Sequence, residues 1–221
     1  MPNQIELLIL DFDGVVIESN DIKTQAFEKV FSQFPQYKDV MMQFHCENIS
    51  VSRVEKFDYL AALMGRGTDS KLKAEIADNF SKYVLEGILR VPMVKGAERL
   101  LKMVRGHLPL YLASVTPANE LNHILEKRGL LHWFEGVYGC PPWTKTNAIR
   151  DIVSRNSILP SNCLLIGDSA GDQRAALETG VQFIARDSGL KFDERPPLIF
   201  LDLNEIADYL GGILKCRIRY L

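Results

Sequence analysis

The chain has 221 residues, of which 47% are hydrophobic and 24% charged, values typical of a soluble globular protein. This length suits one domain with an additional lobe, or two small domains. The formal net charge of −2 excludes the strongly basic surface by which proteins hold nucleic acid or an anionic membrane. The four cysteines are scattered without a C-x-x-C pair, which is typical of reduced thiols and favours a cytoplasmic protein.

The first predicted element is a strand over Ile5–Leu10, a nearly continuous apolar run that ends in Asp-Phe-Asp-Gly. The run is too short to span a membrane, and it lacks the charged start and cleavage site of a signal peptide. Apolar runs of this kind are typical of strands buried on both faces of a parallel sheet. Asp11 and Asp13 therefore stand at a strand end, where two like charges so close together indicate a bound partner rather than a stabilising pair.

The next segment interrupts the strand pattern with helices alone. Apolar residues recur at helical spacing in three stripes, over residues 22–34, 54–64 and 72–88, and no convincing strand lies between Asn20 and Arg90. We expect an all-helical domain over residues 18–91, inserted into a core formed by residues 1–17 and 92–221. The run Val91–Gly96 returns the chain to the sheet.

Strands and helices alternate through the remainder of the chain, which indicates a doubly wound, Rossmann-like parallel sheet and places the protein in the α/β class. The later predicted strands are Leu108–Ser114, Cys163–Gly167, Val181–Ala185 and Leu198–Leu203. The predicted helices are Ala97–Val104, Asn119–Arg128, Thr146–Ser154 and Ala170–Thr179. The C-terminal segment LKCRIRYL suits an edge strand, a dimer contact or a tail, and the oligomeric state stays open.

Polar residues follow several of the predicted strands, and ligands bind beyond the carboxyl ends of parallel strands. They are Asp11, Asp13, Ser114, Thr116, Asp168 and Asp172, with Lys145 just before a helix. Converging carboxylates need a cation, and an oxygen-only site suits Mg²⁺, which also binds phosphate oxygens. A hydroxyl and a lysine supply donors to a phosphoryl group. Since phosphate monoesters hydrolyse extremely slowly without catalysis, a covalent aspartyl-phosphate is plausible.

The stretches DFDGVV, LASVT and GDSAGD, together with Lys145, occur in the order and approximate spacing of the four motifs of the haloacid dehalogenase-like superfamily. The resemblance covers essentially the whole chain. The helical insert is similar to the cap of the branch that contains phosphoglycolate phosphatase and β-phosphoglucomutase. Because dehalogenase and phosphonatase relatives lack the second aspartate, Asp13 favours phosphate-ester chemistry.

The resemblance implies a role for each motif residue. Asp11 is the nucleophile and also ligates Mg²⁺, and Asp13 is the general acid and base, whose backbone carbonyl ligates Mg²⁺. Ser114 binds a phosphoryl oxygen, Lys145 offsets charge on Asp11, and Asp168 ligates the metal.

Other readings remain for several residues. Asp172 positions the site or ligates the metal, directly or through water, but it also suits an ordinary acid in the first turn of a helix. Thr116 competes with Ser114 for the phosphoryl group, Lys145 also suits a solvated helix start, and Asp168 also suits a helix N-cap. Gly14 allows a tight turn beside the substrate.

A second polar cluster lies in the insert, in the segment HCENISVSRVEKF. In similar caps the equivalent loop recognises the leaving group, so we expect these residues to contact the substrate. Arg53 or Lys56 would bind a second anionic group of the substrate, a phosphate or a carboxylate. A solvated helix face explains the same cluster. The candidate substrate-binding residues of the insert are Lys23, Asn48, Ser52, Arg53 and Lys56.

These observations predict a Mg²⁺-dependent phosphatase of a small organic phosphate, such as a sugar phosphate or a phosphoglycolate-like acid. The large cap argues against protein and nucleic-acid substrates. A sugar-phosphate mutase is an alternative, although the loop ENISVSR matches the mutase pattern only through Ser52 and Arg53. A receiver-like phospho-acceptor signalling domain is an alternative from another class, but such a domain needs neither Asp13 nor the insert.

Overall fold

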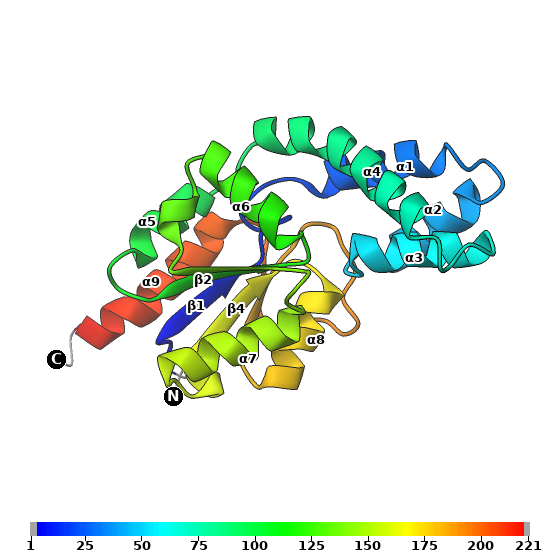
Figure 1. Ribbon diagram of the computed structural model, residues 1–221. Coiled ribbons are helices and arrows are strands. Elements are labelled where there is room, and N and C mark those ends of the chain that lie inside the picture. Colours follow the sequence, from blue (N-terminus) through cyan, green and yellow to red (C-terminus); the bar gives the residue numbers. More distant parts are fainter. Residues whose placement is uncertain (1–3, 219–221) are drawn as a thin grey trace. The chain divides into compact units, whose positions relative to one another are not determined.

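A computed structural model describes residues 4–218, without the side chains of residues 86 and 214–218 (Figure 1). Its centre is a six-stranded sheet in the order β3-β2-β1-β4-β5-β6, and every neighbouring pair of strands is parallel. The strands are β1 (Leu7–Leu10), β2 (Leu110–Ser114), β3 (Gly136–Gly139), β4 (Cys163–Gly167), β5 (Gln182–Arg186) and β6 (Ile199–Phe200). Since β1 lies between β2 and β4, the carboxyl ends of these three strands are adjacent.

Helices cover both faces of the sheet. Alternate residues of β1 point to opposite faces, and Leu7 and Ile9 pack against α7 and α8 in one buried core cluster. Helices α5 and α9 pack against each other on the other face (Figure 1). The helices of this unit are α5 (Ala97–Val104), α6 (Ala118–Lys127), α7 (Lys145–Asn156), α8 (Ala170–Thr179) and α9 (Leu203–Ile218), with short 3₁₀ turns at Leu131–Trp133 and Pro160–Asn162.

The connection from β1 to β2 carries a helical insert. The chain divides into two compact units, between Glu18 and Ser19 and again between Val91 and Pro92. The insert, Ser19–Val91, contains α1 (Asn20–Phe31), α2 (Lys38–Glu47), α3 (Arg53–Leu63) and α4 (Ser70–Arg90). Its core includes Phe27, which stacks with Phe31 and contacts Phe57 and Phe80.

The predicted α/β class, the parallel sheet and the helical insertion between β1 and β2 are confirmed. Among the strands and α-helices, β3, α2 and α9 were not predicted. The segment predicted as a strand over Leu198–Leu203 contains only the two residues of β6 before α9 begins. Of LKCRIRYL, the residues up to Ile218 continue α9 rather than forming an edge strand, and residues 219–221 lie outside the described part of the chain.

Between residues 4 and 218, no helix has an apolar stretch long enough to cross a lipid bilayer.

Candidate active site

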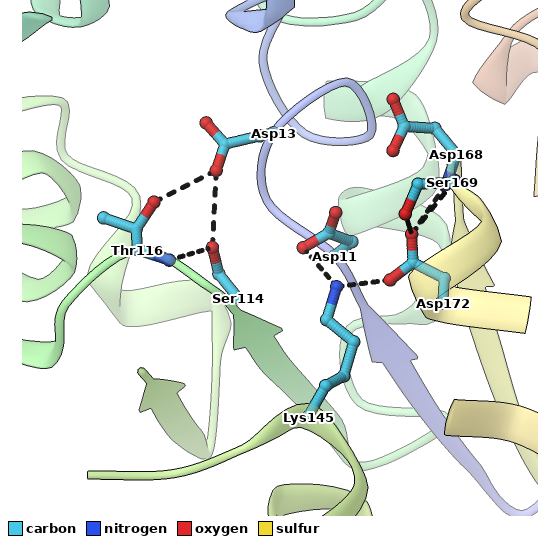
Figure 2. A network of polar contacts seen from close by, with 8 residues as sticks. All are labelled: Asp11, Asp13, Ser114, Thr116, Lys145, Asp168, Ser169 and Asp172. Carbon is cyan, nitrogen blue, oxygen red and sulfur yellow. Dashed lines mark hydrogen bonds and ion pairs between the residues drawn. The ribbon is translucent and has the colours of Figure 1, made fainter. Parts of the chain in front are cut away.

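The predicted motif residues of the sheet unit lie together beyond the carboxyl ends of β1, β2 and β4 (Figure 2). Asp11 follows β1 directly, Ser114 is the last residue of β2, and Asp168 follows β4 directly. Lys145 begins α7, and Asp172 lies in the first turn of α8. Every one of the carboxylates is buried, although the residues lie at the end of a sheet. Such a buried set of like charges requires compensating positive charge.

Lys145 supplies part of that compensation. Its Nζ lies 2.9 Å from Oδ1 of Asp11 and also donates a hydrogen bond to Oδ1 of Asp172. The Lys145 side chain is 10% exposed. A solvated helix-start lysine, the alternative for this position, does not agree with such burial between two carboxylates. Lys145 therefore links the end of β1 to the start of α8.

The carboxylate of Asp172 is held by hydrogen bonds on both oxygens. Oδ1 accepts from Lys145, while Oδ2 accepts from the backbone amides of Asp168 and Ser169 and from the Ser169 hydroxyl at 2.6 Å. Ser169, rather than Asp168, is the N-cap residue of α8. Gly167 lies so close that a Cβ atom there would overlap the Asp172 side chain. These contacts make Asp172 well suited to orient Lys145 and the loop that carries Asp168.

The electrostatics of Asp11 follow from this arrangement. Burial, and then the charges of Asp172, Asp168 and Asp13, raise the pKa of Asp11 well above its usual value, against the lowering effect of Lys145. Burial by itself would lower the pKa of Lys145, but the carboxylates of Asp11 and Asp172 outweigh it and raise that pKa. One ammonium group thus faces several buried carboxylates.

The donor set fits a hard divalent cation. Asp11, Asp168 and Asp172 each offer a carboxylate oxygen, and these oxygens lie within 4.8 Å of one another. All the offered ligands are oxygen atoms, which is the chemistry that Mg²⁺ prefers. A cation there would also lower the raised pKa of Asp11 by direct attraction. The carboxylate of Asp13 is not in this group of described residues, and metal ligation by the backbone carbonyl of Asp13 stays a prediction.

Asp13 instead faces the end of β2 (Figure 2). Its Oδ2 accepts hydrogen bonds from the Ser114 hydroxyl at 3.3 Å and from the Thr116 hydroxyl at 3.1 Å. The backbone amide of Thr116 donates to the Ser114 hydroxyl oxygen at 3.0 Å. Both hydroxyl groups are therefore brought to the site, and phosphoryl binding by either one stays a prediction. Asp11 and Asp13 face different partners, Lys145 for the first and these hydroxyl groups for the second.

The turn after β1 places Asp13. Gly14 has φ 72°, a left-handed conformation that favours glycine, as expected for a tight turn at this position. The Gly14 amide donates to the Ile17 carbonyl at 2.8 Å, and the amides of Val16 and Ile17 donate to the Phe12 carbonyl. Substrate binding by Gly14 stays a prediction.

Four predicted substrate-binding residues of the insert, Asn48, Ser52, Arg53 and Lys56, contact other residues of the insert. The side-chain amide of Asn48 donates to the Phe44 carbonyl. Ser52 is the N-cap residue of α3, where its hydroxyl oxygen accepts from the backbone amide of Glu55. The Arg53 guanidinium lies 5.3 Å from the centroid of the Phe80 ring. Lys23 lies half-buried on α1. Substrate binding by these residues, and by Lys56, stays a prediction.

Lys56 differs from the other insert residues because it is almost fully buried. Its Nζ lies 3.0 Å from Nδ1 of His45, donates to the Ile49 carbonyl and lies over the Phe27 ring. Burial, and then the charge of Lys23, lower the pKa of Lys56 to about 7. Burial and the charge of Lys56 lower the pKa of His45 to about 3. These inward contacts explain Lys56 as part of the insert core.

Two features of the sheet unit were missed from the sequence. Ser169 holds Asp172, and the pattern Ser169-x-x-Asp172 resembles a capping box, which could have indicated the contact. Arg186 at the end of β5 forms an ion pair with Glu18, 168 residues earlier in the chain. No local pattern indicates that second contact.

The comparisons with known proteins agree with this geometry. The phosphoglycolate phosphatase of Vibrio vulnificus is 23% identical over 221 residues, covering 96% of this chain and 95% of the relative. The 6-phosphogluconate phosphatase of Escherichia coli is 21% identical over 189 residues, covering 81% of each chain. The structure of β-phosphoglucomutase from Clostridium difficile superimposes with a TM-score of 0.76 at 17% identity, covering 97% of this chain and 99% of that one.

Residues 8–186 match the family described as haloacid dehalogenase-like hydrolase, and this range includes Asp11, Asp13, Ser114, Lys145 and Asp168. The chain belongs to the haloacid dehalogenase-like hydrolase family.

Proposed function

We propose that the protein is a phosphatase that hydrolyses a small organic phosphomonoester through a phosphorylated Asp11. The observation that carries the proposal is the arrangement in Figure 2, in which the Asp11 carboxylate lies against Lys145 while Asp13 lies against Ser114 and Thr116. A nucleophile, a proton-transferring group and phosphoryl-binding donors are thereby available at one strand edge.

In the first half-reaction, an oxygen of Asp11 forms a bond to phosphorus while the bond from phosphorus to the ester oxygen breaks. The bonding electron pair goes to the leaving oxygen, which takes a proton from Asp13. In the second, Asp13 accepts a proton from water, whose oxygen bonds to phosphorus as the bond to Asp11 breaks. Inorganic phosphate leaves, and both carboxyl groups return to their starting states.

The remaining residues stabilise charge and fix geometry. The Lys145 ammonium group offsets charge on Asp11 and on the phosphoryl oxygens, and Ser114 or Thr116 donates to those oxygens. Asp172 keeps Lys145 in place. A bound Mg²⁺, held by Asp11 and Asp168 with Asp172 close by and the Asp13 carbonyl as a further ligand, would add Lewis-acid stabilisation of the phosphoryl charge.

We further propose that the two units are a catalytic core and a cap domain that selects the substrate, a sugar phosphate or a phosphoglycolate-like acid. Closure of a cap excludes bulk water from a reactive acyl phosphate. The low net charge supports a small phosphorylated metabolite rather than nucleic acid as partner. Free thiols at Cys46, Cys140 and Cys163 support a cytoplasmic location.

The experiment is a screen of phosphomonoesters that includes sugar phosphates and phosphoglycolate, with Mg²⁺ and with a chelator. We expect Mg²⁺-dependent release of inorganic phosphate from at least one substrate, and no release by the folded Asp11→Asn variant. Conversion of a sugar phosphate to an isomer without phosphate release would establish the mutase alternative. Stable phosphorylation by acetyl phosphate with no turnover of any ester would establish the receiver-like alternative.

A further inference from the structure

We propose that Arg186 is a positioning residue that fixes the turn carrying Asp13, and so keeps Asp13 aligned for proton transfer. This inference rests on the acid–base role of Asp13 in the proposed function. Arg186 is the last residue of β5, and β5 is separated from β1 in the sheet by β4. It nevertheless contacts the segment that follows β1.

One guanidinium group holds both ends of that segment. Nη1 of Arg186 donates to the Gly14 carbonyl at 3.2 Å. Nη2 donates to Oε1 of Glu18 at 2.7 Å, and Nη1 to Oε2 of Glu18 at 3.1 Å, a bidentate arrangement. Nε donates to the Leu201 carbonyl at 3.4 Å. Arg186 therefore connects Gly14, directly after Asp13, and Glu18, directly before the insert, to the end of β5.

The geometry is more demanding than that of an ordinary surface ion pair. The Arg186 side chain is 13% exposed and the Glu18 side chain 37% exposed. By contrast, the exposed pair of Arg99 with Asp208 has side chains 52% and 68% exposed. The planar guanidinium binds both oxygens of one carboxylate and, in addition, two backbone carbonyls. This arrangement fixes the positions of all these groups relative to one another, which a lysine cannot reproduce.

Backbone hydrogen bonds carry this constraint to Asp13. The turn from Phe12 to Glu18 is closed internally by the Gly14 amide bonded to the Ile17 carbonyl. Its far end pairs with the returning chain, since the Glu18 amide donates to the Pro92 carbonyl and the Val94 amide to the Val16 carbonyl. The returning segment is itself attached to the start of α9, where the Leu203 amide donates to the Lys95 carbonyl at 3.0 Å. Arg186 adds a side-chain contact that joins the turn directly to the end of β5.

Misplacement of a proton donor slows the cleavage of esters with poor leaving groups more than that of esters with good ones. Comparing two such esters therefore tests specifically whether Arg186 positions Asp13. A p-nitrophenolate leaving group departs with little help from an acid, whereas phenolate, derived from a phenol with pKa of about 10 like that of tyrosine, needs protonation more. The quantity kcat/KM reports the step in which the ester bond breaks. If Arg186 positions Asp13, its loss lowers kcat/KM mainly for phenyl phosphate.

The experiment compares p-nitrophenyl phosphate and phenyl phosphate with Mg²⁺ for wild type, Arg186→Lys and Glu18→Gln. Arg99→Lys is the matched control, because Arg99 likewise joins a carboxylate to a backbone carbonyl, but on the exposed surface of α5. We expect kcat/KM for phenyl phosphate to fall by about 10- to 100-fold in both site variants and that for p-nitrophenyl phosphate by only a few-fold. The control should keep the wild-type ratio of the two.

A double-mutant cycle with Asp13→Asn completes the test. Once Asp13 cannot donate a proton, Arg186→Lys should change the ratio of the two kcat/KM values no further. Equal losses of kcat/KM on both substrates in folded variants would overturn the positioning role of Arg186, and so would a further change of the ratio in the Asp13→Asn background. Either result would leave the proposed function unaffected. Absence of Mg²⁺-dependent turnover of any phosphomonoester by the wild type would instead overturn the proposed function.

Discussion

Replacement of Lys145 by methionine is expected to destabilise the protein strongly, because it removes the ammonium group that faces Asp11 and Asp172. Nζ lies 2.9 Å from Oδ1 of Asp11, and the lysine side chain is 10% exposed. Removal of one partner from a buried ion pair leaves an uncompensated buried charge and costs about 3–5 kcal/mol. We therefore expect the free energy of unfolding of Lys145→Met to fall by about this amount at pH 8 without metal.

The loss should depend on pH in a defined direction. Burial and neighbouring carboxylates raise the pKa of Asp11 even with Lys145 present, so the variant should have a still higher pKa at Asp11. Above about pH 4 the unfolded chain has released this proton while the folded variant retains it. Stability of the variant then falls as pH rises through that window, by up to about 1.4 kcal/mol per pH unit. The wild type shares this fall only up to its own Asp11 pKa, which Lys145 keeps lower, so the deficit of the variant should grow between the two pKa values and be smaller at pH 5 than at pH 8.

The assay is urea unfolding with a chelator at pH 5 and pH 8. Lys102→Met is the control, because Lys102 pairs with Glu98 on the surface, where the side chains are 63% and 66% exposed. Loss of such a pair changes stability by about 0.5 kcal/mol or less. A Lys145→Met variant as stable at pH 8 as the control, or a deficit independent of pH, would refute the electrostatic account of Asp11.

Three further changes test other parts of the site and the insert. Mg²⁺ at ten times its Kd should stabilise the wild type by about 1.4 kcal/mol, a rise in Tm of about 3–6 °C in a thermal-shift assay, and Asp168→Asn should lose this rise. An equal rise in that variant would remove Asp168 as a ligand. Gly167→Ala should cost about 1–3 kcal/mol in urea unfolding and reduce kcat, because its Cβ overlaps Asp172; wild-type stability would contradict that packing. The pKa of Lys56, about 7, lies below the unfolded value, so wild-type stability should rise between pH 7 and pH 10, by up to about 1.4 kcal/mol per pH unit from this residue. Lys56→Met should flatten that rise in urea unfolding, and an unchanged pH dependence would be inconsistent with a buried amine.

The sheet was predictable where its strands are buried on both faces. The run Cys163–Gly167 is fully buried and coincides with β4, and the helix Ala170–Thr179 coincides with α8. By contrast, β3 is a four-residue edge strand with glycine at both ends, so its sequence lacks an apolar run. In α2 only Met41 and His45 are buried, while the apolar residues Val40, Met42 and Phe44 are not, so the apolar residues of this segment do not mark one buried helix face.

The site was predictable as far as its chemistry depends on residues at strand ends. Asp11, Ser114 and Asp168 follow from the strands that precede them, because parallel strands bring their carboxyl ends to one edge. The contact of Arg186 with Glu18 depends on how β5 lies in the folded sheet and has no local signal. The inward orientation of Lys56 likewise depends on packing around His45.

The most direct test of the account is to identify the residue that becomes phosphorylated. Wild-type protein is quenched with acid during turnover of a phosphomonoester with Mg²⁺, treated with borohydride, which reduces an acyl phosphate to an alcohol, and analysed by peptide mass spectrometry. The account predicts reduction at position 11, and none in Asp11→Asn. An active wild-type enzyme in which position 11 is never reduced, or in which another residue carries the phosphoryl group, would contradict the central role of Asp11.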